Sequence, residues 1–299
     1  MKKILSLVFF SFLGLIIWFS FFKSYDHKIS FQVDIPAGSM YDIISSSKTW
    51  EEIGKEQHIT EKTVFKSIKQ NMHINGKPFK LMWTFENRKD TNSTVEINFL
   101  NEEHSLKERY QSLFNTSGNL DTLIKISKNL KEKVNSFASA FRIEINGKDT
   151  LAEMQYLYVT QNTKRKRKAE NMIKSNAQLF SKNRDRLVTK KGPPFNYVKK
   201  WDLESDSIQF RYAFPIEPKA VYPVDQTVKT DHLKKKSVLK ATFYGNYRFS
   251  DQAWIALYHH AQRKNIEIEL TPIEVFYNNP MFGGDDKSWK AEIFMLLKN

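Results

Sequence analysis

The closing stretch of the chain, residues 237–299, decides the fold. Its first part, SVLKATFYGNYRFSDQAWIALYHHAQRKN (237–265), alternates apolar and polar residues, turns at Gly-Asn, and then repeats apolar residues at helical spacing. Its second part, TPIEVFYNNPMFGGDDKSWKAEIFMLLKN (271–299), has two β-rich runs around a Pro/Gly/Asp loop. These patterns predict a strand, a helix and a hairpin. Glu274 lies among apolar residues of the first hairpin strand and is the strongest candidate for a functional residue.

An earlier stretch, residues 151–216, carries the same order of elements. It contains the alternating run LAEMQYLYVTQ (151–161), the helical pattern TKRKRKAENMIKSNAQLFSKNRDRL (163–187) and the hairpin pattern FNYVKKWDLESDSIQFRYAFPI (195–216). Two segments with the same order of strand, helix and hairpin indicate an internal duplication, with repeats at about 151–216 and 237–299 and a loop between them. Alignment of the two hairpins places Asn196 at the position of Glu274.

The amino terminus predicts a membrane anchor. Lys2 and Lys3 are followed by ILSLVFFSFLGLIIWFSFF (4–22), nineteen uncharged and mainly apolar residues, close to the roughly 20 that span a bilayer as a helix. No small-x-small cleavage motif ends this run, so we expect an uncleaved anchor. The lysines favour a cytoplasmic N-terminus. This predicts a single-pass protein of the cytoplasmic (inner) membrane, with its soluble domains on the periplasmic or extracytoplasmic side.

The composition excludes several chemistries. The 299 residues include no cysteine, which rules out disulfides, thiol catalysis and cysteine-bound metals, and the seven histidines show no metal-ligand spacing. We therefore expect neither a metal nor a cofactor. The net charge of +14 suits anionic partners, but the basic runs 164–168 and 234–236 lack a recognition helix or interleaved aromatic residues. We expect them to face solvent or anionic lipid, and we expect no specific nucleic acid partner.

Residues 27–148 are predicted to form the first soluble domain, after an anchor and spacer at 1–26. Alternating runs separated by turn residues predict an antiparallel sheet, and SLKERYQSLF (105–114) is read as one of its strands. Apolar residues at spacings of three or four from Asp121 to Phe141 then predict one long helix.

The opening of this domain resembles the START-like (SRPBCC, polyketide-cyclase-like) family. The matching residues are Asp34, Ile35, Pro36, Ala37, Tyr41, Ile44 and Trp50. The resemblance implies a helix-grip fold, in which an antiparallel sheet curls around a long C-terminal helix and leaves an apolar cavity for a lipid-like or aromatic ligand. A collapsed version without a cavity stays open as an alternative.

Residues 149–299 resemble the GyrI-like effector-binding domain of drug-responsive regulators. The matching residues are Gly245, Tyr247, Trp254, Pro272, Glu274, Tyr277 and Glu292. The resemblance implies two repeats around a central cleft in which Glu274 contacts cationic aromatic ligands. The sequence departs from the family pattern because neither a helix-turn-helix nor a coiled coil precedes the domain, so we do not expect a transcription factor.

Glu274 is the centre of the predicted ligand site. A carboxylate among aromatic rings suits a lipophilic cation, because the ring faces and the anion both stabilise positive charge in a partly dry pocket. The ligand-binding residues predicted with it are Tyr244, Tyr247, Trp254, Tyr277 and Glu292. The residues alone also allow a simpler interpretation, in which Glu274 faces solvent from an edge strand and the aromatic residues belong to an ordinary core.

Together these patterns predict a bacterial α+β protein that is anchored in the membrane and binds small lipophilic or cationic aromatic molecules, as a sensor or a sequestering protein. Two alternatives stay open. One is a hydrolase of reactive small molecules, in which Glu274 and Glu292 together activate a water molecule. The other is a non-catalytic interaction module of the cell envelope, whose clefts are filled by side chains.

Overall fold

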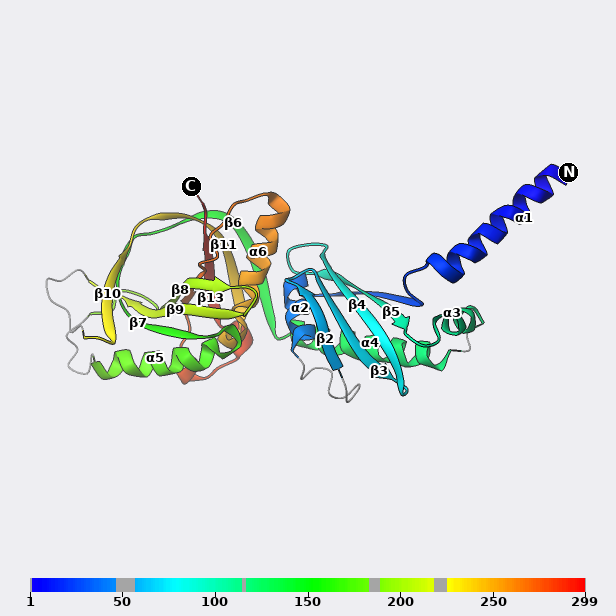
Figure 1. The fold of residues 1–299 in the computed structure, drawn as a ribbon. Helices are drawn as coiled ribbons and strands as arrows, with labels where there is room; N and C mark the ends of the chain where they lie inside the picture. Colours follow the sequence, from blue (N-terminus) through cyan, green and yellow to red (C-terminus); the bar gives the residue numbers. More distant parts are fainter. Residues whose placement is uncertain (1, 47–56, 115–116, 183–188, 218–224, 299) are drawn as a thin grey trace. The chain divides into compact units, whose positions relative to one another are not determined.

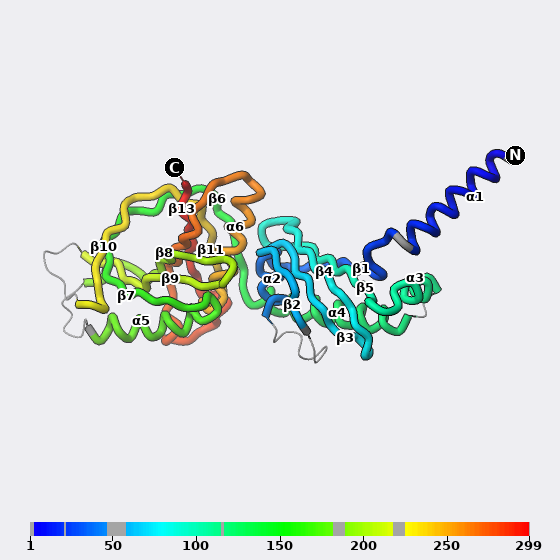
Figure 2. Tube along the Cα trace, viewed as in Figure 1, coloured from blue at the N-terminus to red at the C-terminus, as the bar shows by residue number. Residues whose placement is uncertain are grey.

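A computed structural model of the chain describes residues 2–46, 57–114, 117–182, 189–217 and 225–298 (Figure 1, Figure 2). These ranges contain six α-helices and two antiparallel sheets, which confirms the predicted α+β class. The chain divides into two compact units, which comprise residues 1–88 with 92–135, and residues 89–91 with 136–299. Trp50 of the START-like resemblance and the end of the predicted helix 163–187 lie outside the described residues.

The first unit begins with an apolar helix, α1 (Lys2–Ile17), which continues as a short π-helical segment, η1 (Trp18–Phe22). Leucine, isoleucine and phenylalanine surround the helix without a polar stripe, and only 6% of the window Lys3–Ser20 is buried. Within the described ranges it is the one helix that is long and apolar enough to cross a membrane. So much exposed apolar surface is unusual for a water-soluble protein.

The sheet of the first unit has five antiparallel strands in the order β1-β5-β4-β3-β2. The strands are β1 (His27–Val33), β2 (Gln57–Thr63), β3 (Ser67–Ile74), β4 (Lys77–Asn87) and β5 (Ser93–Asn101), and the helices of this unit after α1 are α2 (Ala37–Ser45), α3 (Ser105–Leu113) and α4 (Gly118–Ala138). Burial alternates along β5, where Val95, Ile97 and Phe99 are buried. This half-buried alternation is the pattern that predicted the sheet.

Two sequence predictions for this part of the chain are wrong. The pattern of residues 105–114 predicts a strand, but most of them form helix α3. So short an apolar pattern fits both periods, and the long-range contacts of the helix decide between them. The predicted long helix ends at Ala138, and Phe141 starts a strand, β6 (Phe141–Leu151). Pairing of β6 with a distant strand, β11 (Lys236–Gly245), overrides the local helical pattern.

The sheet of the second unit has eight antiparallel strands in the order β10-β7-β9-β8-β12-β13-β11-β6 and is strongly curved (Figure 1). The elements after β6 are β7 (Met154–Lys164), η3 (Arg165–Arg167), α5 (Lys168–Lys182), β8 (Phe195–Asp202), β9 (Ser207–Pro215), β10 (Val228–Leu233), β11 (Lys236–Gly245), η4 (Tyr247–Phe249), α6 (Gln252–Lys264), β12 (Ile273–Phe276), η5 (Pro280–Phe282), η6 (Asp286–Ser288) and β13 (Lys290–Leu296). Strand, helix and hairpin follow one another in both 151–216 and 237–299.

The order of strands reads the same outward from the central pair β8 and β12. On one side follow β9 and β7, and on the other side follow β13 and β11. The stretch between the two segments was predicted to be a loop, but it contains the edge strand β10. This strand has only two buried residues, Val228 and Leu233, so its hydrophobic pattern was too weak to predict it.

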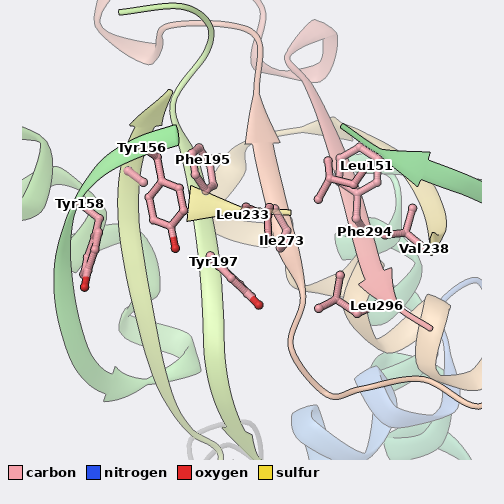
Figure 3. Packing of buried hydrophobic residues seen from close by; sticks show 11 residues of the cluster. Leu151, Tyr156, Tyr158, Phe195, Tyr197, Leu233, Val238, Ile273, Phe294 and Leu296 are labelled. Carbon is pink, nitrogen blue, oxygen red and sulfur yellow. The ribbon is translucent and has the colours of Figure 1, made fainter. Parts of the chain in front are cut away.

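One face of this sheet carries a cluster of buried apolar and aromatic side chains, shown from close by in Figure 3. The cluster consists of Leu151, Tyr156, Tyr158, Phe195, Tyr197, Ala213, Leu233, Val238, Ile273, Phe294 and Leu296. Because side chains alternate between the two faces of a strand, the neighbours of Ile273, Phe195 and Phe294 in sequence point to the opposite face. Glu274 is one of these neighbours.

Candidate functional site

Glu274 lies at the centre of the sheet and is completely buried, with 0% of its surface exposed. It belongs to β12, which has β8 on one side and β13 on the other, and it pairs with Asn196 of β8. The interpretation that placed Glu274 on a solvent-facing edge is therefore wrong. Its two carboxylate oxygens accept hydrogen bonds from Lys168 Nζ (2.5 Å), Ser250 Oγ (2.6 Å), Asn196 Nδ2 (2.8 Å) and Trp254 Nε1 (3.0 Å).

Lys168, the first residue of α5, is the counter-ion of Glu274. Only 1% of Lys168 is exposed, and its ammonium group lies 4.6 Å from the centre of the Trp254 ring. Asp251, just before α6, lies 3.9 Å from the same ammonium group and pairs with Arg165 on its other side. We call Arg165, Lys168, Asp251 and Glu274 the buried charge cluster. It joins the starts of α5 and α6 to the central strand β12.

The sequence does not predict Lys168 and Arg165 as site residues, because the basic run 164–168 is typical of a solvated helix start. One signal in the sequence was available. Lys168 lies on the same helical stripe as Ser175 and Leu179, which are buried on α5, so its position on the helix indicates an inward direction. A lysine at such a position needs a buried anion nearby, and Glu274 provides it.

The predicted aromatic residues do not all gather around Glu274. Trp254 is fully buried and bonds to Glu274. Tyr247 donates a hydrogen bond to the carbonyl oxygen of Lys290 (2.8 Å), and the ring of Tyr244 lies 4.1 Å from the Arg142 guanidinium group. Tyr244 and Tyr247 therefore contact other groups.

Tyr277 and Glu292 form a second pair, away from Glu274. The Tyr277 hydroxyl donates to Glu292 Oε2 at 2.7 Å. Glu292 is opposite Val275 in the register of β12 and β13, whereas Glu274 is opposite Ile293. The two carboxylates thus point to opposite faces of the sheet. Glu274 and Glu292 therefore do not meet at one water molecule, as the hydrolase hypothesis requires of this pair.

A cleft of about 570 Å³ lies on the Glu292 face of the sheet. Its walls are mainly apolar and aromatic and include Leu151, Met154, Phe195, Val275 and Phe294. Its charged or titratable groups are Glu153, Lys191, His232, Tyr277 and Glu292. Of the six predicted ligand-binding residues, Tyr277 and Glu292 line this cleft; Glu274, Tyr244, Tyr247 and Trp254 do not.

Electrostatic contacts keep Glu292 ionised. Partial burial opposes ionisation, but hydrogen bonds from Tyr277 and Lys290 and the nearby Lys240 outweigh it, and the pKa of Glu292 lies below its usual value. The pKa of Tyr277 lies above its usual value. Burial is the largest cause, and the hydrogen bond to Glu292 and the negative charge of that carboxylate add to it. At neutral pH the cleft therefore presents a carboxylate that is held in place by a neutral tyrosine. Among the described residues no group of three or more His, Asp or Glu side chains could hold a metal ion.

His259, on α6, makes the stability of the second unit depend on pH. Burial lowers the pKa of His259 from 6.5 to about 4. Between these values the unfolded chain binds a proton that the folded chain does not, so we expect stability to fall as the pH drops from about 6.5 to about 4, by up to about 3 kcal/mol. Denaturant unfolding at several pH values measures this loss. His259→Gln should remove it, and His232→Gln, at an exposed position of β10, should keep it; equal slopes in both variants would contradict the assignment.

The fold and the cleft define an α+β protein whose second unit offers a pocket of small-molecule size. No family model matches the sequence, and no curated protein matches it either. Solved structures similar to the chain include EcmrR in a complex with DNA (11% identity, TM-score 0.45, 66% of this chain and 72% of that chain) and SAV2435 bound to tetraphenylphosphonium (12%, 0.36, 53% and 94%). Another is an uncharacterized conserved protein from Listeria innocua (11%, 0.39, 56% and 98%). Because these TM-scores are below 0.5, we infer a function only from the geometry of this chain.

Proposed function

We propose that the chain is a membrane-anchored small-molecule-binding protein, and that its ligand occupies the cleft lined by Tyr277 and Glu292. The cleft carries the proposal. Its volume of about 570 Å³ lies within the range of roughly 300–1,000 Å³ that is typical of ligand pockets, which combine apolar walls with a few placed polar groups. The role in ligand binding proposed for Glu274 from the sequence passes to Glu292, because the oxygens of Glu274 already bond to four buried donors.

The chemistry of the cleft favours a lipophilic cation with aromatic groups. The rings of Phe195, Phe294 and Tyr277 offer apolar faces, and Glu292 and Glu153 offer negative charge. Rings and carboxylates together stabilise a cation that carries little hydration of its own. Glu292 is partly neutralised by lysines, with Lys290 Nζ at 3.0 Å, so we expect moderate affinity with a large apolar contribution.

The wider organisation of the chain belongs to the same proposal. We propose that residues 1–26 are the anchor and spacer, that the first unit contains a START-like domain, and that the second unit contains a duplicated GyrI-like domain. The boundary expected between residues 148 and 149 then lies before β6, because Phe141–Leu151 is a strand of the second sheet. The symmetric strand order around β8 and β12 supports the duplication. The five-stranded antiparallel sheet followed by α4 supports the START-like domain. We place both domains outside the cytoplasmic membrane, with α1 crossing it.

Calorimetric titration of the full chain with tetraphenylphosphonium tests the cleft. We expect binding to the wild type, and a roughly 5–10-fold weaker affinity for Glu292→Gln, because the loss of one partly screened charge changes the free energy of binding by about 1 kcal/mol. Glu204→Gln, in the turn between β8 and β9, removes an exposed carboxylate that does not line the cleft and is the matched control. If Glu204→Gln weakens binding as much as Glu292→Gln, or if the wild type does not bind, this assignment fails.

A further inference from the structure

Helix α3 has its polar and apolar sides reversed compared with an ordinary surface helix. It buries the charged residues Glu108 (1% exposed) and Arg109 (5% exposed). It exposes Leu106 (44%), Tyr110 (42%) and Leu113 (61%), and the residue that follows the helix, Phe114 (76%), extends this stripe of large apolar or aromatic side chains. A helix normally turns its apolar stripe to the core and its charges to water. The exposed stripe of α3 therefore needs an apolar environment outside the unit.

The buried side of α3 holds the end of the apolar helix. The Arg109 guanidinium donates hydrogen bonds to the carbonyl oxygens of Phe19 (2.9 Å), Ser20 (3.2 Å) and Lys23 (2.6 Å). Its Nε also donates to Asp26 Oδ1 at 2.7 Å. Carbonyl groups at the end of a helix lack partners within the helix, and a cation near them is favourable. Arg109 thus fastens α3 to the chain where the apolar helix ends.

Tyr110, on the exposed side of α3, makes a second set of contacts with η1. The Tyr110 hydroxyl and Ser20 Oγ are 2.8 Å apart, and the rings of Tyr110 and Phe19 are in edge-to-face contact with centres 5.9 Å apart. Next to them the side chains of Trp18 and Phe22 are exposed. The exposed stripe of α3 thus lies beside the exposed apolar side chains of η1, which directly follows α1 in the chain.

We infer that α3 docks on the lipid bilayer, with Leu106, Tyr110, Leu113 and Phe114 inserted at the boundary of headgroups and acyl chains. The inference rests on the proposed membrane crossing by α1. If α1 crosses the bilayer, the membrane surface lies near Trp18 to Lys23, where aromatic residues and a lysine are typical of the interface. Arg109 holds α3 at that level, which selects lipid as the occupant of the stripe.

The proposed anchoring of the chain by α1 makes the small contact between α3 and lipid effective. A helix of nine residues that exposes three large apolar or aromatic side chains, with a fourth on the next residue, would bind a membrane weakly by itself. Because α1 keeps α3 beside the bilayer, docking is intramolecular and the effective concentration of lipid is high. Two attachments, α1 and α3, then restrict how the first unit tilts on the membrane. A single flexible linker would leave it free to rotate.

Site-directed fluorescence tests the docking in the full chain, reconstituted in vesicles of phosphatidylcholine and phosphatidylglycerol that contain lipids brominated near the headgroup or along the chain. The absence of cysteine from the sequence allows single labels at Leu113→Cys on α3, Leu13→Cys on α1 and Glu132→Cys on α4. Leu113 and Glu132 are both exposed, so labelling should leave the fold intact, which circular dichroism checks. We expect brominated lipid to quench labels 13 and 113 several-fold more than label 132.

Three other patterns of quenching would contradict the docking of α3 on the bilayer. Quenching of label 13 without quenching of label 113 overturns the docking of α3 and leaves the anchor intact. The absence of quenching at both positions overturns the anchor and the docking together, whereas ligand binding in the cleft is measured separately by the titration with tetraphenylphosphonium. A label at 113 that is shielded from water without being quenched by lipid indicates a protein partner or a second copy of the chain, and also overturns the inference.

Discussion

Lys168→Met is expected to lower the free energy of unfolding of the second unit by about 3–5 kcal/mol. The substitution removes the ammonium group that lies 2.5 Å from Glu274 and leaves that carboxylate buried at 0% exposure. Ser250, Asn196 and Trp254 still donate hydrogen bonds to it, but none of them carries a compensating charge. Hydrogen exchange of the amides of β8 and β12 at increasing denaturant concentration measures the loss in the unit that contains the pair.

The same helix provides a matched control. Lys174 pairs with Glu170 at 2.8 Å, and both side chains are largely exposed. Water and salt screen such a pair, so Lys174→Met should leave stability almost unchanged. The double variant Lys168→Met with Glu274→Gln should recover part of the loss, since it no longer contains an unpaired buried charge. Equal effects of Lys168→Met and Lys174→Met would show that the buried pair is no stronger than a surface pair.

Arg109→Met is expected to destabilise the first unit by a similar amount, about 3–5 kcal/mol. It leaves the Asp26 carboxylate, which is 2% exposed, without its cation. It also removes the donor to the carbonyl oxygens of Phe19, Ser20 and Lys23. Faster hydrogen exchange in α3 and in residues 24–27, measured in detergent micelles, would report both losses.

Lys107→Met is the control for Arg109→Met, because Lys107 is on the same helix and exposed. Arg109→Lys is a sharper comparison. One ammonium group cannot reproduce the fork of donors that reaches Asp26 and the three carbonyl groups together, so this conservative change should also destabilise the unit. Full stability in Arg109→Lys would mean that charge alone, without the geometry of the guanidinium group, holds the helix end.

The candidate site was only partly predictable from the sequence. Tyr277 and Glu292 were both singled out as ligand-binding residues, and both line the cleft. Glu274 was recognised as unusual because it is a carboxylate in an apolar strand. Its partner was not found, because Lys168 lies 106 residues away and is one of several cations in a basic run. Nothing local in the sequence distinguishes a buried lysine from its solvated neighbours except its position on the helical stripe of α5.

By itself, the sequence determined the elements whose signal is local. The apolar run 4–22 predicts a helix because it is long and apolar throughout, and it is helical in the structure. The alternation of apolar and polar residues predicts β4 and β5, because the side chains of a half-buried strand point alternately inward and outward. Tertiary structure decided what depends on pairing between distant segments. It made a strand of Phe141–Leu151, a helix of Ser105–Leu113 and an edge strand of Val228–Leu233. It also placed Glu274 and Glu292 on opposite faces, because the side-chain direction in a strand follows its register with neighbouring strands, which no single segment specifies.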